Sequence, residues 1–295
     1  MSTRQKLQNK AYIPEKWENV NCPVCNSNVF SEWERFGDKM QYTYVLCKKC
    51  KLVYLNPRPL YNEAFVFDAY EFYAENDERY NITDDFYNTK TTFEKQEAQE
   101  VCKYDERRTN LLDVGSAAGK FLFRAMPFYK KVTGLEVSSR MAELVKSRLN
   151  INVLTDKFEN VTPNEKFSCI NMSHVIEHYP FPHNWLQKAK TLLEDDGILV
   201  VSVPNMFSLD RLVKRFVKKI GLFKNAWESW RTPDHLFEPT INAMNYLFKS
   251  EGFKIIDYYT YSRKKMNINS FTGRIYHRYF RLGSNLKFIV KPQKE

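Results

Sequence analysis

Residues 111–136 read LLDVGSAAGKFLFRAMPFYKKVTGLE, and this stretch decides the fold. An apolar run from Leu111 to Val114 ends at small residues, which favours a buried strand followed by a tight turn. Apolar residues at helical spacing come next, and a second apolar run then ends at Glu136. Strand, turn, helix, strand and acid in this order predict the first βαβ unit of a nucleotide-binding sheet.

The turn G-S-A-A-G at residues 115–119 argues against a phosphate ligand. A dinucleotide fingerprint needs G-x-G-x-x-G, and a phosphate-binding loop needs four residues between its glycines, where this turn has three. An adenosine ligand without phosphates fits better, because Glu136 can accept hydrogen bonds from both hydroxyls of a ribose. The start of the following helix, near Gly119, can favour a carboxylate.

D113-V-G-S-A-A-G119 followed by G134-L-E136 resembles the first two motifs of class I S-adenosylmethionine (SAM) methyltransferases. The family has glycine more often where this chain has Ala117, and alanine takes little extra room there. The resemblance implies an α/β, Rossmann-like sheet of seven strands with the last one antiparallel, and SAM as cosubstrate. The alternative is a similar fold with another ligand or none.

The same resemblance implies a set of SAM-contacting residues. Asp156 is expected to accept from the adenine amino group, and Phe158 to cover the adenine ring. The full set is Asp113, Gly115, Ser116, Ala117, Gly119, Glu136, Val137, Asp156, Phe158 and Ser173.

Four of the six cysteines form two C-x-x-C pairs, Cys22 with Cys25 and Cys47 with Cys50. In a cytosolic protein this spacing favours a metal site over disulfides. Two such turns can aim four thiolates at one ion, which predicts structural zinc with no open position for catalysis. Reduced free cysteines in a small β-hairpin and an iron–sulfur cluster are the alternatives.

The resemblance extends over most of the chain. A four-cysteine ribbon, then YLNPRP at residues 54–59, then a tyrosine-rich stretch and the SAM motif resemble a bacterial methyltransferase group. That group has an N-terminal zinc ribbon and is often associated with surface-polysaccharide or natural-product pathways. The implied organisation is an arm and zinc ribbon over 1–59, a helical, aromatic bridge over 60–107 and a methyltransferase domain over 108–295. Substrate-side insertions are expected at 205–239 and 262–284.

Three histidines are the candidate catalytic residues. S173-H-V-I-E-H178 resembles the family segment that follows strand four, and His174 and His178 would share one face of a helical turn beside Glu177. D234-H-L-F-E-P-T240 resembles the family segment before the last main helix. The histidines can act as a general base, hold a divalent metal with Glu177, or form a hydrogen-bonded cluster that shapes the pocket. His235 is a second candidate base or substrate ligand, or else a structural hydrogen-bonding group.

The net charge of +10 lies in the last third of the chain, since residues 204–295 hold 18 Lys and Arg against 7 Asp and Glu. Such an excess suits nucleic acid, an anionic membrane or a phosphorylated substrate, and it also suits a solvated basic face. No apolar run approaches the ~20 residues of a membrane span. The N-terminus lacks the apolar core of a signal peptide, so a cytoplasmic protein is expected.

Residues 209–220 predict a strongly amphipathic helix with a basic second face. The favoured interpretation is that its apolar stripe packs on its own domain. The alternative is that it lies on an anionic membrane near a lipid-linked acceptor, which would make the protein peripheral on the inner membrane face.

The function expected from these features is methyl transfer from SAM to a small-molecule acceptor. The resemblance points first to a hydroxyl of a sugar or sugar-containing intermediate, phosphorylated or lipid-linked. The alternatives are an RNA methyltransferase that uses the zinc ribbon and the basic last third, and a non-catalytic SAM-binding module.

Overall fold

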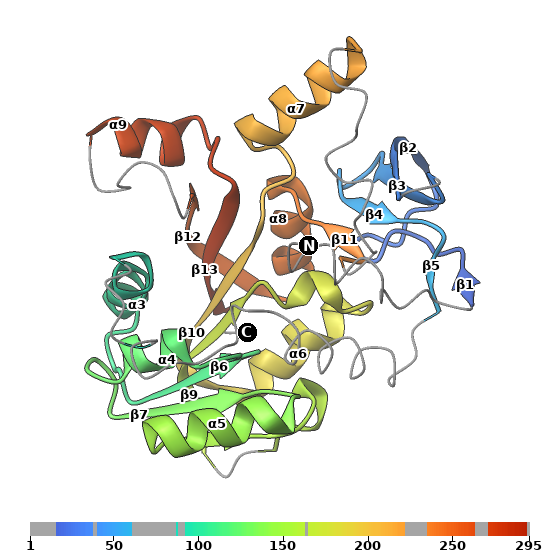
Figure 1. The fold of residues 1–295 in the computed structure, drawn as a ribbon. Coiled ribbons are helices and arrows are strands. Elements are labelled where there is room, and N and C mark those ends of the chain that lie inside the picture. Colours follow the sequence, from blue (N-terminus) through green and yellow to red (C-terminus); the bar gives the residue numbers. More distant parts are fainter. Residues whose placement is uncertain are drawn as a thin grey trace, which may run out of the picture.

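The computed structural model describes residues 16–37, 40–60, 87, 92–162, 165–221, 235–262 and 271–293 (Figure 1). Most of the bridge expected over 60–107 lies outside these residues, as do 222–234 and 263–270 of the expected insertions. Within the described ranges, no helix is long and apolar enough to cross a membrane.

A seven-stranded mixed sheet forms the body of the molecule, in the order β12-β13-β10-β9-β6-β7-β8 (Figure 1). The five strands from β10 to β8 in this order run parallel, and β13 is antiparallel to both of its neighbours, β10 and β12. This confirms the Rossmann-like sheet with an antiparallel last strand. The strands are β6 (Asn110–Val114), β7 (Lys131–Leu135), β8 (Asn152–Leu154), β9 (Phe167–Ser173), β10 (Leu193–Pro204), β12 (Phe253–Tyr261) and β13 (Asn285–Pro292).

Helices cover both faces of this sheet because alternate strand residues point to opposite sides. Leu111 packs in one core with α3, α4 and α5, whereas its neighbour Leu112 packs in another with α6 and α8. Ser138 and Thr240 cap α5 and α8 by accepting from backbone N–H groups three residues on. The helices are α3 (Thr92–Tyr104), α4 (Lys120–Ala125), α5 (Ser139–Leu149), α6 (Pro182–Leu192), α7 (Leu209–Lys219), α8 (Ile241–Ser250) and α9 (Phe271–Arg274). Short turns of other helix types are η2 (Phe158–Asn160), η3 (Ile176–His178) and η4 (Ile275–Tyr279).

Residues 16–60, called the cysteine module below, build a second sheet beside the first (Figure 1). Its order is β11-β4-β3-β2, with β2 (Phe30–Phe36), β3 (Tyr42–Cys47) and β4 (Val53–Leu55). The fourth strand, β11 (Phe237–Glu238), comes from far along the chain and pairs antiparallel with β4. A short pair, β1 (Trp17–Glu18) and β5 (Arg58–Pro59), flanks this sheet. The cysteine module is therefore completed by a strand from the segment expected as a substrate-side insertion.

Candidate active site

The turn after β6 has the backbone that its small residues suggest. Gly115 and Gly119 have φ of 70° and 71°, in the left-handed region, and a Cβ at Gly115 would lie 2.4 Å from Val175 Cγ1. Ala117 also adopts this region, with φ of 44°. A residue with a Cβ pays about 1–2 kcal/mol there. The departure from the family's glycine is therefore a matter of backbone conformation rather than of room.

Glu136 ties this turn to the end of β7. Its Oε2 accepts from the Ala117 N–H at 2.7 Å, and its Oε1 accepts from the Ser138 N–H at 3.0 Å. A carboxylate offers about four acceptor sites, so these two bonds are compatible with additional bonds from a ribose. The acid thus stands where a nucleoside would meet both the turn and the strand end.

Asp113 lies beneath the turn and is almost completely buried. Burial raises its pKa to about 7; the hydrogen bond from Asn171 opposes this rise, and the nearby carboxylates of Glu97 and Glu136 add to it. The Asn171 Nδ2–H donates to Asp113 Oδ1 at 2.7 Å. Burial therefore favours the neutral form of this carboxyl.

The two residues expected to contact adenine, Asp156 and Phe158, differ in their exposure to solvent. Asp156 is exposed after β8, and its Oδ1 accepts from the Lys157 N–H at 2.7 Å and from Asn160 Nδ2 at 2.9 Å. Phe158 is only 2% exposed, and its ring packs 5.2 Å from that of Trp185 within the core. The expected contact of Phe158 with adenine stays a prediction, and in this structure the ring packs among core side chains.

The remaining residues expected at the SAM site lie along the same sheet edge. Ser116 is buried in the turn, Val137 follows β7, and Ser173 ends β9. Strands β6, β7 and β9 are parallel neighbours, so their C-terminal ends meet at one edge. Contacts of these residues with SAM stay a prediction.

The spacing of His174 and His178 predicts that they share one face of a helical turn, but in the structure they do not. Only Ile176–His178 form the short turn η3, and His174 stands before it with a left-handed φ of 57°. Its Nε2 lies 3.3 Å from Tyr261 Oη, and its Nδ1 lies 3.4 Å from Glu177 Oε1. A non-glycine residue keeps such a strained backbone conformation only where surrounding contacts hold it in place.

His178 and His235 meet although 57 positions separate them in the sequence. Their ring centroids are 4.7 Å apart with planes at 82°. His235 Nδ1 lies 2.9 Å from Glu238 Oε1, and Glu238 Oε2 accepts from Arg211 Nη1 at 2.9 Å. The Leu236 N–H donates to the Glu177 carbonyl at 2.9 Å, which fixes the two segments side by side.

Glu177 is fully buried at the centre of this cluster. Neither of its carboxylate oxygens has a hydrogen-bond partner of good geometry among the described residues. Burial alone would raise its pKa, but His174, followed by His178 and His235, more than offsets this and holds the pKa below its ordinary value. Glu177 therefore carries a negative charge at neutral pH.

Glu177, His178 and His235 each offer one ligand atom, and these atoms lie within 4.8 Å of one another. The three could hold a divalent ion, so a metal site, a general base and a hydrogen-bonded cluster all remain compatible with the geometry.

The four cysteines of the two C-x-x-C pairs converge on one buried point. Cys22 Sγ lies 3.4 Å from Cys50 Sγ, and Cys25 Sγ lies 3.4 Å from Cys47 Sγ. All four sulfurs lie within 4.8 Å of one another. Zinc–sulfur bonds of about 2.3 Å in a tetrahedron require sulfur separations of ~3.8 Å, so the donor set and its spacing fit Zn²⁺.

The cysteine module also forms one wall of the histidine cluster. Tyr44 Oη donates to the His235 carbonyl at 3.0 Å, and β4 pairs with β11, which carries Glu238. On its other side, His183 on α6 lies between the Val24 carbonyl at 2.9 Å and Glu251 Oε1 at 2.6 Å. The position of His235 thus depends on strands that are distant in the sequence.

A model of the methyltransferase-domain family matches residues 64–258. The chain belongs to this family. The mixed seven-stranded sheet, with β13 antiparallel to its neighbours, is the class I fold that the sequence resemblance implies.

Two curated relatives match part of this methyltransferase. It is 27% identical over 106 residues to the ubiquinone biosynthesis O-methyltransferase of Glaesserella parasuis, and 28% identical over 106 residues to that of Haemophilus ducreyi. Each match covers 32% of this chain and 45% of the relative, so less than half the length of either relative is matched.

Solved structures share the fold of the methyltransferase. The 1,6-didemethyltoxoflavin N1-methyltransferase of Burkholderia thailandensis has a TM-score of 0.53 and 13% identity, over 86% of this chain and 96% of that one. A SAM-dependent methyltransferase from Archaeoglobus fulgidus has a TM-score of 0.50 and 14% identity, over 78% of this chain and 100% of that one.

Several residues of the methyltransferase's histidine cluster carry no signal in the sequence. Tyr44, Arg211 and Tyr261 each contact a histidine or its partner, yet none stands in a recognisable motif. Glu238 alone had a local cue, since it lies three residues after His235. Tertiary pairing brings in the others.

Proposed function

We propose that this methyltransferase transfers the methyl group of SAM to a hydroxyl of a sugar or sugar-containing small molecule. The observation that carries the proposal is the contact of His178 and His235 beside the buried, charged Glu177. A hydroxyl must lose its proton as it attacks, and a neutral imidazole can take that proton near pH 7. The sugar class rests on the resemblance of the chain to bacterial methyltransferases with an N-terminal ribbon.

Oxygen as the acceptor atom has a second line of support. Both curated relatives are named as O-methyltransferases, although their similarity spans only 32% of this chain.

Different residues of the chain would bind SAM and remove the proton from the acceptor. SAM supplies a methyl group that its sulfonium already activates, so the protein mainly aligns the two reactants. Glu136 and the turn at 115–119 bind the nucleoside part. With Nδ1 of His235 bonded to Glu238, the basic lone pair of a neutral ring lies on Nε2, which can accept the hydroxyl proton. The charge of Glu177 then stabilises the imidazolium of His235 or His178.

We also propose a structural zinc ion held by Cys22, Cys25, Cys47 and Cys50. The support is the fit of four buried sulfurs to a tetrahedral site. With all four positions filled by protein, the ion would hold the cysteine module together and take no part in methyl transfer.

Radiolabelled methyl transfer from SAM into a fractionated extract of the source cell tests the main proposal. Label in a soluble or lipid-linked sugar fraction is the expected result, and His178→Gln protein should give far less of it. Label that ribonuclease removes would overturn the proposal in favour of an RNA methyltransferase. SAM binding by the purified protein without transfer to any fraction would leave a non-catalytic SAM-binding module.

A further inference from the structure

Helix α7 is amphipathic, but its faces are reversed relative to an ordinary surface helix. Its apolar residues Leu209, Leu212, Val213 and Phe216 are exposed, and Phe216 is 62% exposed. Ile220, just after the helix, is exposed as well. The interpretation favoured from the sequence, that this stripe packs on its own domain, is therefore wrong.

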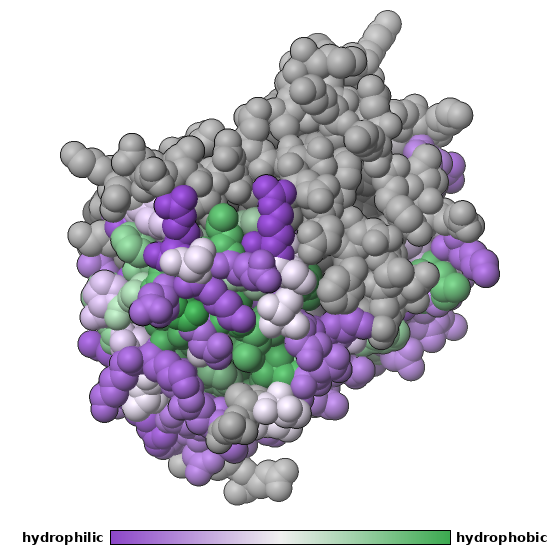
Figure 2. Space-filling view, turned by 60° about the horizontal axis from the view of Figure 1, so that its bottom comes forward, coloured by the Kyte–Doolittle hydropathy of each residue, from purple (hydrophilic) through white to green (hydrophobic). Residues whose placement is uncertain are grey.

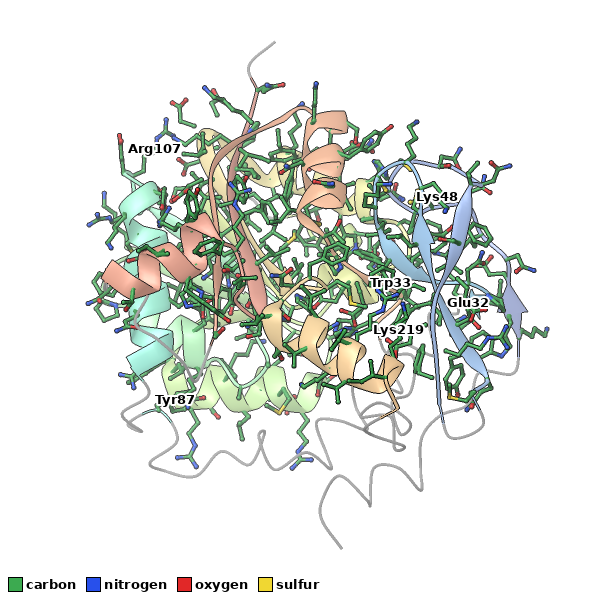
Figure 3. All side chains as sticks on the ribbon, turned by 90° about the horizontal axis from the view of Figure 1, so that it is seen from above. Glu32, Trp33, Lys48, Tyr87, Arg107 and Lys219 are labelled. Atoms are coloured by element: carbon green, nitrogen blue, oxygen red, sulfur yellow. The ribbon has the colours of Figure 1, made fainter. Side chains whose placement is uncertain are left out.

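The basic face of α7 is what holds the helix to the protein. Arg211 pairs with the buried Glu238 at 2.9 Å. The Arg215 guanidinium lies 3.4 Å from the centre of the Trp33 ring on β2 and also contacts the Trp33 carbonyl. Figure 3 shows Trp33 on the side of the cysteine module that faces the end of α7, where Lys219 lies. These contacts fix the helix with its apolar stripe outward.

The outward stripe continues on a neighbouring segment. The Leu209 N–H donates to the Leu282 carbonyl at 3.1 Å, so the start of α7 adjoins the chain that follows η4. On that segment Tyr279 is 78% exposed, and Ile275 and Phe280 are exposed too. Of the sixteen large exposed hydrophobic residues in the described part of the chain, eight lie on these two segments.

Both segments lie on one side of the molecule. Figure 1 shows α7 and α9, which leads into η4, at the top, away from α5. Figure 2 shows the side at the bottom of that view, where hydrophilic residues surround a smaller hydrophobic area. We call the exposed apolar residues of these two segments the α7 face (Leu209, Leu212, Val213, Phe216, Ile220, Ile275, Tyr279 and Phe280).

We propose that the α7 face docks on the surface of an anionic lipid bilayer. A convex helix with an outward apolar stripe suits the boundary between headgroups and acyl chains better than it suits a closed groove. Lys219 is exposed at its end, and the chain from residue 204 onward carries 11 more basic than acidic residues, of which Arg211, Lys214 and Arg215 contact the protein itself. That excess favours anionic over neutral headgroups.

Docking in this way places the histidine cluster near the bilayer. Arg211 lies on α7 itself, and its partner Glu238 orients His235. A lipid-linked sugar is the acceptor that this arrangement suits, a step that rests on the proposed function. The docking itself does not depend on it.

Vesicle flotation tests the proposal with the full-length protein. Vesicles of phosphatidylcholine with roughly a third phosphatidylglycerol should float the protein at low salt, and phosphatidylcholine alone should float far less. Raising NaCl from about 0.05 to 0.5 M should weaken the binding, because salt screens the headgroup charge. No difference between the two vesicle types at low salt would overturn the proposal.

Variants separate the α7 face from general stickiness. Phe216→Glu should lower the bound fraction at least about tenfold, and Met126→Glu, a matched change at the end of α4, should leave it unchanged. Equal flotation of both variants and the wild type would overturn the proposal. So would sedimentation showing that Phe216→Glu converts a dimer to a monomer with no effect on vesicles, since the α7 face would then bind a second copy.

The same variants distinguish docking from the proposed activity. Phe216→Glu should retain SAM binding and methylation of a soluble acceptor, because Phe216 touches neither the turn nor the histidines. Flotation that persists while the label proves to be in RNA would leave docking intact and overturn the sugar proposal.

Discussion

The proposed site has a cofactor side around the turn at 115–119 and an acceptor side around the histidines. Each side buries a carboxyl group, and the two groups behave in opposite ways. On the cofactor side, burial raises the pKa of Asp113 to about 7, with only the Asn171 amide to oppose it. On the acceptor side, three histidines hold the pKa of Glu177 below its ordinary value despite complete burial. Partner charge therefore decides which buried acid is ionised at neutral pH.

The two sides also differ in how the chain assembles them. Most of the cofactor side comes from one continuous stretch, 111–136, in which the Glu136 carboxylate accepts a hydrogen bond from the Ala117 N–H of the turn. The acceptor side gathers residues from the cysteine module, η3, α7, β11 and β12. The five variants that follow probe this division in order of decreasing effect.

Replacing His178 with glutamine should have the largest effect. Loss of a general base lowers turnover by about 10²–10⁴-fold. SAM affinity, measured by titration calorimetry, should change less than about twofold, because His178 lies on the acceptor side. An equal loss of SAM binding would show that the two sides do not act separately.

Glu136→Gln should act on the cofactor side and lower SAM affinity. The change removes the charge that holds the Ala117 and Ser138 N–H groups, and hydrogen bonds to charged groups contribute about 1.5–3 kcal/mol each. SAM affinity should fall roughly 10- to 100-fold. Turnover at saturating SAM should fall much less. Glu143→Gln on the exposed side of α5 is the control and should change neither quantity.

Asp113→Asn should stabilise the protein above neutral pH. The folded state keeps the Asp113 proton up to about pH 7, whereas the unfolded chain releases it near its ordinary pKa, so wild-type stability falls as pH rises between the two. The variant avoids this loss and should gain on the order of 4 kcal/mol at pH 8, and little near pH 4. Denaturant unfolding at both pH values measures the difference.

Glu177→Gln is the opposite case and completes that test. Because its folded pKa is lowered, Glu177 contributes stability above its ordinary pKa and loses that contribution as pH falls. The variant should therefore be less stable than the wild type at pH 7, with the gap closing in acid. If both variants changed the free energy of unfolding in the same direction at neutral pH, the contrast between the two acids would be wrong.

Ala117→Gly should have the smallest effect. Relief of the left-handed φ should raise the free energy of unfolding by about 1 kcal/mol and leave SAM affinity nearly unchanged. The neighbouring Ala118 has no such φ, so Ala118→Gly should instead lower stability. Thermal unfolding of the two variants, compared with the wild type, measures both changes in stability.

The sequence predicted what short-range pattern determines. The strands β6 and β7 and their turn follow from local periodicity and turn chemistry, and the seven-stranded sheet with an antiparallel last strand follows from the family resemblance. Two features depend on tertiary contacts and escaped prediction. Phe158 is enclosed by a core that no local pattern reveals, and α7 faces outward because Glu238 and Trp33 hold its arginines.

The candidate site shows the same limit. His174, His178 and His235 were found from their motifs, but Tyr44 reaches His235 only because two sheets meet. Strand β11 is two residues long, and so short a pairing with β4 leaves no alternating pattern to read.

The pairing of β11 with β4 has a consequence for how such proteins can be shortened or recombined. A truncation that begins after residue 60 would leave Phe237 and Glu238 as an unpaired edge, with the buried Phe237 side chain newly open to water. An exchange of the first 60 residues with those of another methyltransferase would have to carry residues 235–240 along with them. The N-terminal module can therefore be exchanged only together with a segment almost 180 positions downstream.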